Sequence, residues 1–402
     1  MNAPTLARPS FAGVSHEQAV SRAHALVPAL RERAAATEAA RGLLPETIAE
    51  LDRSGLMRIL QPRRWGGMEL DFLSIVDVPD ILGRGCCSTA WAFANVAIHH
   101  WMLALYEERA QREVWDANPD AYIASGIAFP QGRGQVVDGG ILLSGHWNFS
   151  SAVGSSQWNM LACLVRDGEK IIDYRICLVP AGAYEVVDDW QVMGLAGTGS
   201  MSVRCEKLFV PEHRALSMLR GRDGRGFPGC IVNPGAIYRI PFGGLAAHCL
   251  LGALVGNAQA MFDAITTMVT ERSTSYTALK MRDLGTVQAR IGLAGAHLDA
   301  ARLIARNDSI AGQRMAAAGE TADMLYKLSL KRNCAYAMKL ATDCVDTLYA
   351  LAGANGLYQR GPIERIYRDQ HAAAGHINFS LDAQTSAWGL AAAGGEVNNP
   401  TL

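Results

Sequence analysis

The hydrophobic period of the sequence changes twice, and this change restricts the fold more than any other feature. Up to about residue 119 the apolar residues recur every three or four positions, and from about 236 onward they do so again. In between, segments such as GILLSGHWNFS (140–150) alternate with period two between glycine-rich turns. The sequence therefore predicts an α+β fold in three parts: an N-terminal helical domain (1–119), a middle β domain (120–235) and a C-terminal helical bundle (236–402).

Local patterns support each part. Ser15 with Gln18 forms a capping-box signal before the first helix, and Ser88 is a plausible cap for a later one. The strands are short and lie close together along the chain, so we expect an antiparallel sheet or small barrel and not βαβ units. Further strands are expected at IIDYRICLVP (171–180) and SVRCEKLFVP (202–211).

Composition excludes several classes of protein. The formal net charge is -1 over 402 residues, so the chain offers no basic surface to a nucleic acid. Its nine cysteines are scattered without zinc spacing, which favours reduced thiols in a cytoplasmic protein and no metal site. The apolar stretch 243–262 is interrupted by His248, glycines and Asn257, so it reads as a buried helix and not as a membrane span. Residues 1–13 contain no apolar core of a signal peptide.

Several local motifs are missing. No GxGxxG follows a strand, which disfavours a nicotinamide site, and the glycine-rich GLAGTGS (194–200) has no P-loop lysine. GxSxG and HExxH are also absent, so a serine hydrolase and a zinc protease are disfavoured.

Four segments in sequence order carry a family resemblance. They are RRWGGMELDFLSIVDVPDILGRGCCSTAWAF, GHWNFSSAVGSSQW, MGLAGTGSMSVRCEKLFVP and LAGANGLYQRGPIERIYRD. Together they cover most of the chain and resemble the acyl-CoA dehydrogenase superfamily. The resemblance implies a helical domain, a β-barrel-like domain and a C-terminal four-helix bundle, assembled as a flavin-binding homotetramer.

The residues of the family's base positions indicate which branch this is. Many acyl-CoA dehydrogenases place a glutamate eight residues after the Arg-Asp pair, where this chain has Ile377, and the alternative position within 236–244 has no carboxylate. Proton abstraction beside a thioester needs a positioned base, so dehydrogenation of an acyl-CoA is disfavoured. His376, the Phe-Ser-Ser segment and the His99–Trp101 spacing instead resemble the oxygenase components of two-component flavin monooxygenases.

That branch implies a reaction and its partners. Reduced FMN, or FAD, would come from a separate NAD(P)H:flavin reductase and react with O2 through a C4a-hydroperoxyflavin. The expected substrate is a small aromatic of the phenol or indole type, which is hydroxylated or epoxidised. The alternatives are oxidation of sulfur or nitrogen, an FAD-dependent acyl-CoA dehydrogenase or oxidase, and a non-catalytic scaffold that kept the fold.

Three residues are the predicted catalytic groups. His376 could deprotonate the substrate, because an imidazole accepts protons near neutral pH. His99 is the predicted second pocket group, although adjacent His100 or a purely structural role for either ring stays open. Ser151 could bond flavin N5, with Ser150 as the alternative, since strand alternation puts Ser151 on the face of Trp147 and Phe149.

The predicted cofactor-binding residues come from four segments. The loop residues Thr198 and Ser200 offer hydroxyls to a flavin edge, and Trp147 could form a dry wall. By resemblance, Arg272 could reach a flavin phosphate, including that of a neighbouring subunit. Arg368 is a further candidate, although an ion pair with Asp369 is the alternative. The full predicted set is Ser125, Trp147, Ser150, Ser151, Thr198, Ser200, Arg272 and Arg368.

Overall fold

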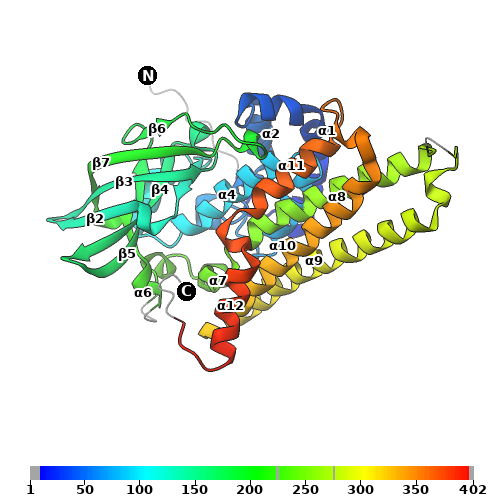
Figure 1. Cartoon of the computed structure of the whole chain (residues 1–402). Helices are drawn as coiled ribbons and strands as arrows, with labels where there is room; N and C mark the ends of the chain where they lie inside the picture. Colours follow the sequence, from blue (N-terminus) through cyan, green and yellow to red (C-terminus); the bar gives the residue numbers. More distant parts are fainter. Residues whose placement is uncertain (1–9, 223–225, 275–276, 398–402) are drawn as a thin grey trace, which may run out of the picture.

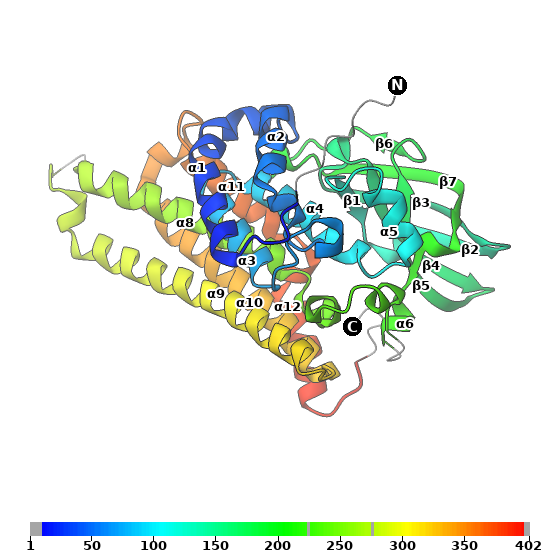
Figure 2. The same ribbon diagram turned by 180° about the vertical axis from the view of Figure 1, so that it is seen from behind.

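The computed structural model describes residues 10–222, 226–274 and 277–397, so the expectation for the first nine residues lies outside it. Figures 1 and 2 show a twisted sheet at one end of the molecule and a body of helices at the other, with α4 between them. The order of the parts is the predicted one: helices, then strands, then helices.

The N-terminal helices follow local signals closely. They are α1 (His16–Ala40), α2 (Pro45–Ser54), α3 (Ser74–Gly83), α4 (Cys87–Leu103) and α5 (Glu108–Trp115). The capping box between Ser15 and Gln18 is present at the start of α1. The prediction of Ser88 as a cap is wrong, because α4 begins at Cys87 after an extended Cys86 and Ser88 already lies inside the helix.

Eight strands form the sheet. They are β1 (Ile123–Gly126), β2 (Gly132–Val137), β3 (Gly140–Ser150), β4 (Trp158–Asp167), β5 (Lys170–Pro180), β6 (Glu185–Val187), β7 (Met201–Pro211) and β8 (Ala215–Ser217). The order is β6-β7-β3-β2-β4-β5-β8, with β1 beside β4. Most pairs are antiparallel, as expected, while β1–β4 and β2–β4 are parallel. Both β1 and β2 therefore run in the same direction as β4.

The C-terminal part is dominated by three long helices, α8 (His248–Glu271), α9 (Gly285–Ala317) and α10 (Met324–Ala352). The shorter elements are α6 (Met218–Arg222), α7 (Phe242–Leu245), α11 (Ile363–Ala374), the 3-10 turn η11 (Ile377–Phe379) and α12 (Leu381–Ala392). The segment Gly243–Glu271 is long and apolar enough to cross a membrane, yet 78% of its most apolar window is buried against the rest of the fold. This burial is typical of a core helix, because neighbouring helices already cover the apolar surface.

Two further expectations concern cysteine and metal chemistry. All nine cysteines are unpaired thiols, and most are buried. Within the part of the chain that the structure describes, no group of three or more His, Cys, Asp or Glu side chains is arranged to hold a metal ion.

Candidate functional site

Trp91 of α4 joins the sheet to the C-terminal bundle. Its indole Nε1 donates a hydrogen bond to Ser151 Oγ at 3.3 Å. The ring meets His376 edge-on with 5.8 Å between centroids, and Phe379 in the same way at 6.4 Å. The predicted catalytic residues Ser151 and His376, 225 positions apart in the sequence numbering, therefore lie on either side of one buried aromatic ring.

The hydroxyl groups of Ser151, Ser200 and Thr198 form a row of hydrogen bonds in which each donor is determined. Thr198 Oγ1 donates to the Leu195 carbonyl at 2.8 Å, so it accepts from Ser200 Oγ at 2.7 Å. Ser200 must then accept from Ser151 Oγ at 2.8 Å, and Ser151 accepts from Trp91. Every hydroxyl proton is thereby used, and Ser151 Oγ keeps a free lone pair that can accept a further hydrogen bond.

The backbone before Ser151 explains which serine faces Trp91. The β3–β7 register shifts between Trp147 and Ser150, and Phe149 takes φ 65. This conformation is uncommon for a bulky residue and turns Phe149 outward, where 69% of it is exposed. The prediction that Ser151 shares a face with Phe149 is therefore wrong. Ser150 points instead toward the barrel, where its Oγ accepts from Asn159 Nδ2 at 3.0 Å.

Hydrogen bonding determines which nitrogen of His376 carries a proton. The backbone N–H of Asn378 donates to His376 Nδ1 at 3.2 Å, and His376 caps the turn η11. A backbone N–H is always a donor, so Nδ1 is unprotonated and the neutral ring carries its proton on Nε2. Burial, with the nearby Lys331 charge, lowers the pKa of this half-buried ring to about 4. In this geometry His376 presents a hydrogen-bond donor, and the role of base does not follow from it.

His99 has the opposite arrangement. Its Nδ1 lies 2.6 Å from the carbonyl oxygen of Ile123 in β1, and a carbonyl can only accept, so Nδ1 carries the proton. Nε2 is therefore an unprotonated acceptor, and burial lowers the pKa of the ring to about 4. Neighbouring His100 accepts from Trp115 Nε1 at 3.1 Å and stacks on that indole, so it is a core residue.

The lowered pKa values of these three rings predict acid sensitivity of the fold. Burial lowers the pKa of His99 and His376 to about 4 and that of His100 to about 3, whereas an unfolded histidine titrates near 6.5. Between these values the unfolded chain binds more protons, so the free energy of unfolding should fall as the pH falls from about 6.5 to 4. Urea midpoints measured at pH 7 and pH 5 check this. His100→Gln should make the dependence shallower, and an unchanged dependence would contradict the assignment.

Ser125 lies in β1, two residues after Ile123, whose carbonyl bonds His99 of α4. Ile123 belongs to the large helical core, whereas Ala124 packs in the barrel core, so successive residues of β1 face opposite sides. Ser125 therefore shares the helix-facing side with Ile123, whose carbonyl holds His99. This places the predicted Ser125 on the side of the sheet where α4 packs.

The loop carrying Thr198 and Ser200 is fixed by α11. Asp369 Oδ1 accepts from the Leu195 N–H at 2.6 Å, and burial raises the pKa of this carboxyl to about 7. Gly194 packs on the Arg368 carbonyl so closely that a Cβ would lie 2.3 Å from its oxygen. Leu195 takes φ 56, a strained conformation that these contacts maintain.

The remaining predicted cofactor residues do not face this cluster. Arg368 pairs with Glu364 and Glu38 and donates to the Met193 carbonyl at 2.7 Å, so the suggested ion pair with Asp369 is wrong. Trp147 is fully enclosed in the barrel core and donates to the Ala162 carbonyl, so it cannot form a wall of the site. Arg272 caps the end of α8, which projects away from the sheet in Figure 1.

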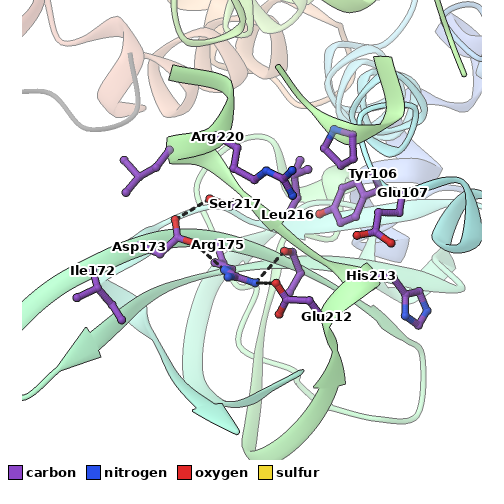
Figure 3. Close-up of a pocket in the computed structure, with 13 residues that line it drawn as sticks. Tyr106, Glu107, Ile172, Asp173, Arg175, Glu212, His213, Leu216, Ser217 and Arg220 are labelled. Atoms are coloured by element: carbon purple, nitrogen blue, oxygen red, sulfur yellow. Dashed lines mark hydrogen bonds and ion pairs between the residues drawn. The ribbon is translucent and has the colours of Figure 1, made fainter. Parts of the chain in front are cut away.

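A cavity of about 350 Å³ lies elsewhere, between α6, β5 and β8. Figure 3 shows Arg175 on its wall, bonded to Asp173 and Glu212, while Ser217 bonds Asp173. Its charges are largely paired, and none of the predicted site residues lines it. We therefore place the candidate site at the Trp91 cluster and not in this cavity.

Sequence reasoning missed two residues of the cluster. Trp91 lies within an almost wholly apolar segment, so nothing in the sequence indicates that its indole N–H donates a hydrogen bond in the site. Asp369 was considered only as a partner of Arg368. A buried carboxylate in an amphipathic helix was the available signal, because such groups need a hydrogen-bond partner.

Two family models and several known proteins match this chain. The family model described as acyl-CoA dehydrogenase, N-terminal domain, matches residues 16–116, and the one for the C-terminal domain matches residues 248–381. The chain is 34% identical over 356 residues to the flavin-dependent monooxygenase oxygenase subunit HsaA of Mycobacterium tuberculosis, covering 87% of this chain and 89% of the relative. It is 30% identical to the oxygenase component of the FADH(2)-dependent resorcinol hydroxylase of a Rhizobium species, covering 92% of each chain.

The solved structures show the same similarity. The crystal structure of the HsaA monooxygenase from M. tuberculosis superposes with a TM-score of 0.91 at 30% identity, covering 96% of this chain and all of the other.

Proposed function

Since this chain belongs to the oxygenase components of flavin-dependent monooxygenases, which share the acyl-CoA dehydrogenase fold, we propose that it hydroxylates a small phenol with reduced flavin and O2. The observations that carry the proposal are His376 beside Trp91 and Ser151, and a second buried histidine of α4, His99, whose neutral ring has the opposite tautomer. Where many dehydrogenases keep a glutamate, this chain has Ile377, whose side chain is 68% exposed. The cluster thus offers proton donors and acceptors suited to a hydroxyl group, and no carboxylate base at that position.

The donor set fits a reduced flavin. The N5–H of a reduced flavin is a donor, and Ser151 Oγ has the free lone pair to accept it. Ser151 is held from two sides, by Trp91 and by Ser200, so its lone pair has a fixed direction. Bound reduced flavin would supply the activation of dioxygen, and the enclosed aromatic surroundings would keep water away from that chemistry.

The two histidines have different roles toward the substrate, one as a proton acceptor and the other as a hydrogen-bond donor. His99 Nε2 accepts the phenol proton, because its Nδ1–H is occupied by the Ile123 carbonyl. His376 Nε2–H donates to an oxygen that gains negative charge during the reaction. Both rings are neutral above about pH 5, so neither role requires a charged imidazole in the free enzyme.

The cofactor form and the assembly are part of the same proposal. We favour FMN and leave FAD open, since one relative is named as FADH(2)-dependent. A separate NAD(P)H:flavin reductase would supply the reduced flavin in the cytoplasm. In a homotetramer, Arg272 at the projecting end of α8 could reach a phosphate bound to a neighbouring subunit. In the free chain Arg272 donates to the Ala352 carbonyl at 3.1 Å.

The function is tested by oxygen and product measurements. The purified protein should be colourless, consume O2 only when reduced flavin is supplied, and convert phenols to hydroxylated products. Indoles and thiophenes in the same panel would reveal epoxidation or sulfur oxidation. A yellow protein with tightly bound FAD that reduces its flavin with acyl-CoA would overturn the proposal in favour of a dehydrogenase.

Ser151→Ala tests the position of the flavin. Losing one hydrogen bond of about 1 kcal/mol should raise hydrogen peroxide release per O2 consumed roughly fivefold. Peroxide and product are measured together in single-turnover reactions. Ser150→Ala is the matched control, because Ser150 bonds Asn159 toward the barrel and should leave the ratio unchanged. The reverse pattern would assign the contact to Ser150, and no change in either variant would remove the serine from the proposal.

A further inference from the structure

Lys331 of α10 lies behind His376 and has an unusual environment for a charged side chain. Its Nζ donates to Asn378 Oδ1 at 3.2 Å, and the backbone N–H of Asn378 is the group that holds His376 Nδ1. Lys331 is half-buried, and burial lowers the pKa of its ammonium. Lys331 and His376 are thus joined through a single residue.

The ammonium of Lys331 has no carboxylate partner across residues 10–222, 226–274 and 277–397. Within those residues it forms no ion pair, and it donates its hydrogen bond to the amide of Asn378. Arg302 pairs with Asp80 and Arg368 with Glu364, whereas the ammonium of Lys331 bonds a neutral amide. An ammonium has three N–H donors, and Asn378 uses one of them. A half-buried cation without a counter-ion is costly, which suggests that a ligand supplies the negative charge.

The position of Lys331 limits what that ligand is. Neighbouring Leu330 packs against α7, where a Cβ on Gly244 would lie 2.8 Å from Leu330 Cδ1. On the other side lies η11 with His376 and Phe379, which face Trp91. Lys331 acts electrostatically on His376 and on the thiol of Cys334. The Asp308 carboxylate also acts on Cys334, but it bonds Asn333 and His248 and not Lys331. A ligand at this position would contact His376 and Lys331 together.

We propose that Lys331 binds an ionised acidic group of the aromatic substrate, so that the preferred substrate is a phenol bearing a carboxylate. A phenol hydroxyl alone does not satisfy the site, because its pKa lies near 10 and it is neutral when it binds at pH 7. A carboxylate is ionised and accepts two hydrogen bonds from the free donors of the ammonium. This inference names the substrate class of the site and rests on the proposed function.

The test compares matched substrates. Phenols with a carboxylate at the end of a one-, two- or three-carbon chain are paired with neutral alkylphenols of equal length. In the unchanged enzyme kcat/KM should favour the acid of the best length by about tenfold or more, equivalent to about 1.4 kcal/mol. Lys331→Met should abolish this preference chiefly through KM, and Lys331→Arg should restore part of it. Lys339→Met is the control, since Lys339 pairs with Asp343 on an exposed part of the same helix.

A binding measurement separates this inference from the oxygenase proposal. Phenylacetate and its longer homologues cannot be hydroxylated at a phenol carbon, but they should bind the flavin-free protein and quench tryptophan fluorescence. Lys331→Met should weaken this binding at least tenfold, and Lys331→Gln serves if the methionine variant does not fold. If no phenol is hydroxylated but the carboxylic acids still bind, only the proposed oxygenase function would be refuted. A wild-type preference for the neutral phenols, or equal losses for both members of each pair, would overturn the role of Lys331.

Discussion

Replacing His99 by alanine should lower hydroxylated product formation about 100-fold, because general base catalysis by a positioned side chain contributes at least that much. Its Nε2 is an unprotonated acceptor, since Nδ1 is committed to the Ile123 carbonyl at 2.6 Å. Consumption of O2 with reduced flavin should continue and release hydrogen peroxide instead of product. The measurement is the ratio of product to O2 consumed in single turnovers.

His99→Asn is the matched variant for this result. An asparagine amide can keep the hydrogen bond to the Ile123 carbonyl, so β1 and α4 stay joined, but it does not reach the position of Nε2. It should therefore fold normally and show the same loss of product as His99→Ala. Full activity in His99→Asn would show that the ring is structural and would remove it from the mechanism.

Replacing His376 should have the second largest effect, and its pattern distinguishes a donor from a base. His376→Ala should lower product formation about 10- to 100-fold, the range expected for losing one hydrogen bond to a charged oxygen. His376→Asn should be similarly impaired, although it can still cap η11 by accepting from the Asn378 N–H. His376→Gln should recover much of the activity, because its amide can place an N–H near the position of Nε2.

The pH dependence gives an independent check of both histidines. Their pKa values are lowered to about 4, so product formation should be constant from pH 6 to 8 and fall only as the pH approaches 4, where the rings become protonated. If His376 were the base, His376→Gln would be as inactive as His376→Ala, since an amide does not accept a proton at these pH values. That outcome would return the base to His376.

The histidine pair shows how far local reasoning extends. Sequence motifs predict His99, His376 and Ser151 as pocket groups. Which nitrogen of each histidine ring carries the proton depends on the Ile123 carbonyl and the Asn378 amide. Strand alternation favours Ser151 over Ser150 for the wrong reason, because it is the strained Phe149 and a shifted register that turn Ser151 toward Trp91. A bulge of this kind leaves no periodic pattern in the sequence.

The charged residues show the same division. Arg368 was expected beside Asp369, yet it pairs with Glu38 of α1, 330 positions away, while Asp369 holds Leu195. Trp147 was expected at a pocket wall because it lies on the apolar face of β3, and that face is the closed interior of the barrel.

The sequence by itself determined the order of helices and strands, the start of the first helix at Ser15, and the absence of a glutamate at position 377, because periodicity, caps and residue chemistry are local properties. Only the tertiary structure decided that Trp91 joins Ser151 to His376, that Asp369 fixes the loop of Thr198 and Ser200, and that Lys331 bonds Asn378 and no carboxylate among the residues that the structure describes. These contacts join residues far apart in the chain, and their partners depend on how α4, α10 and α11 pack against the sheet and each other.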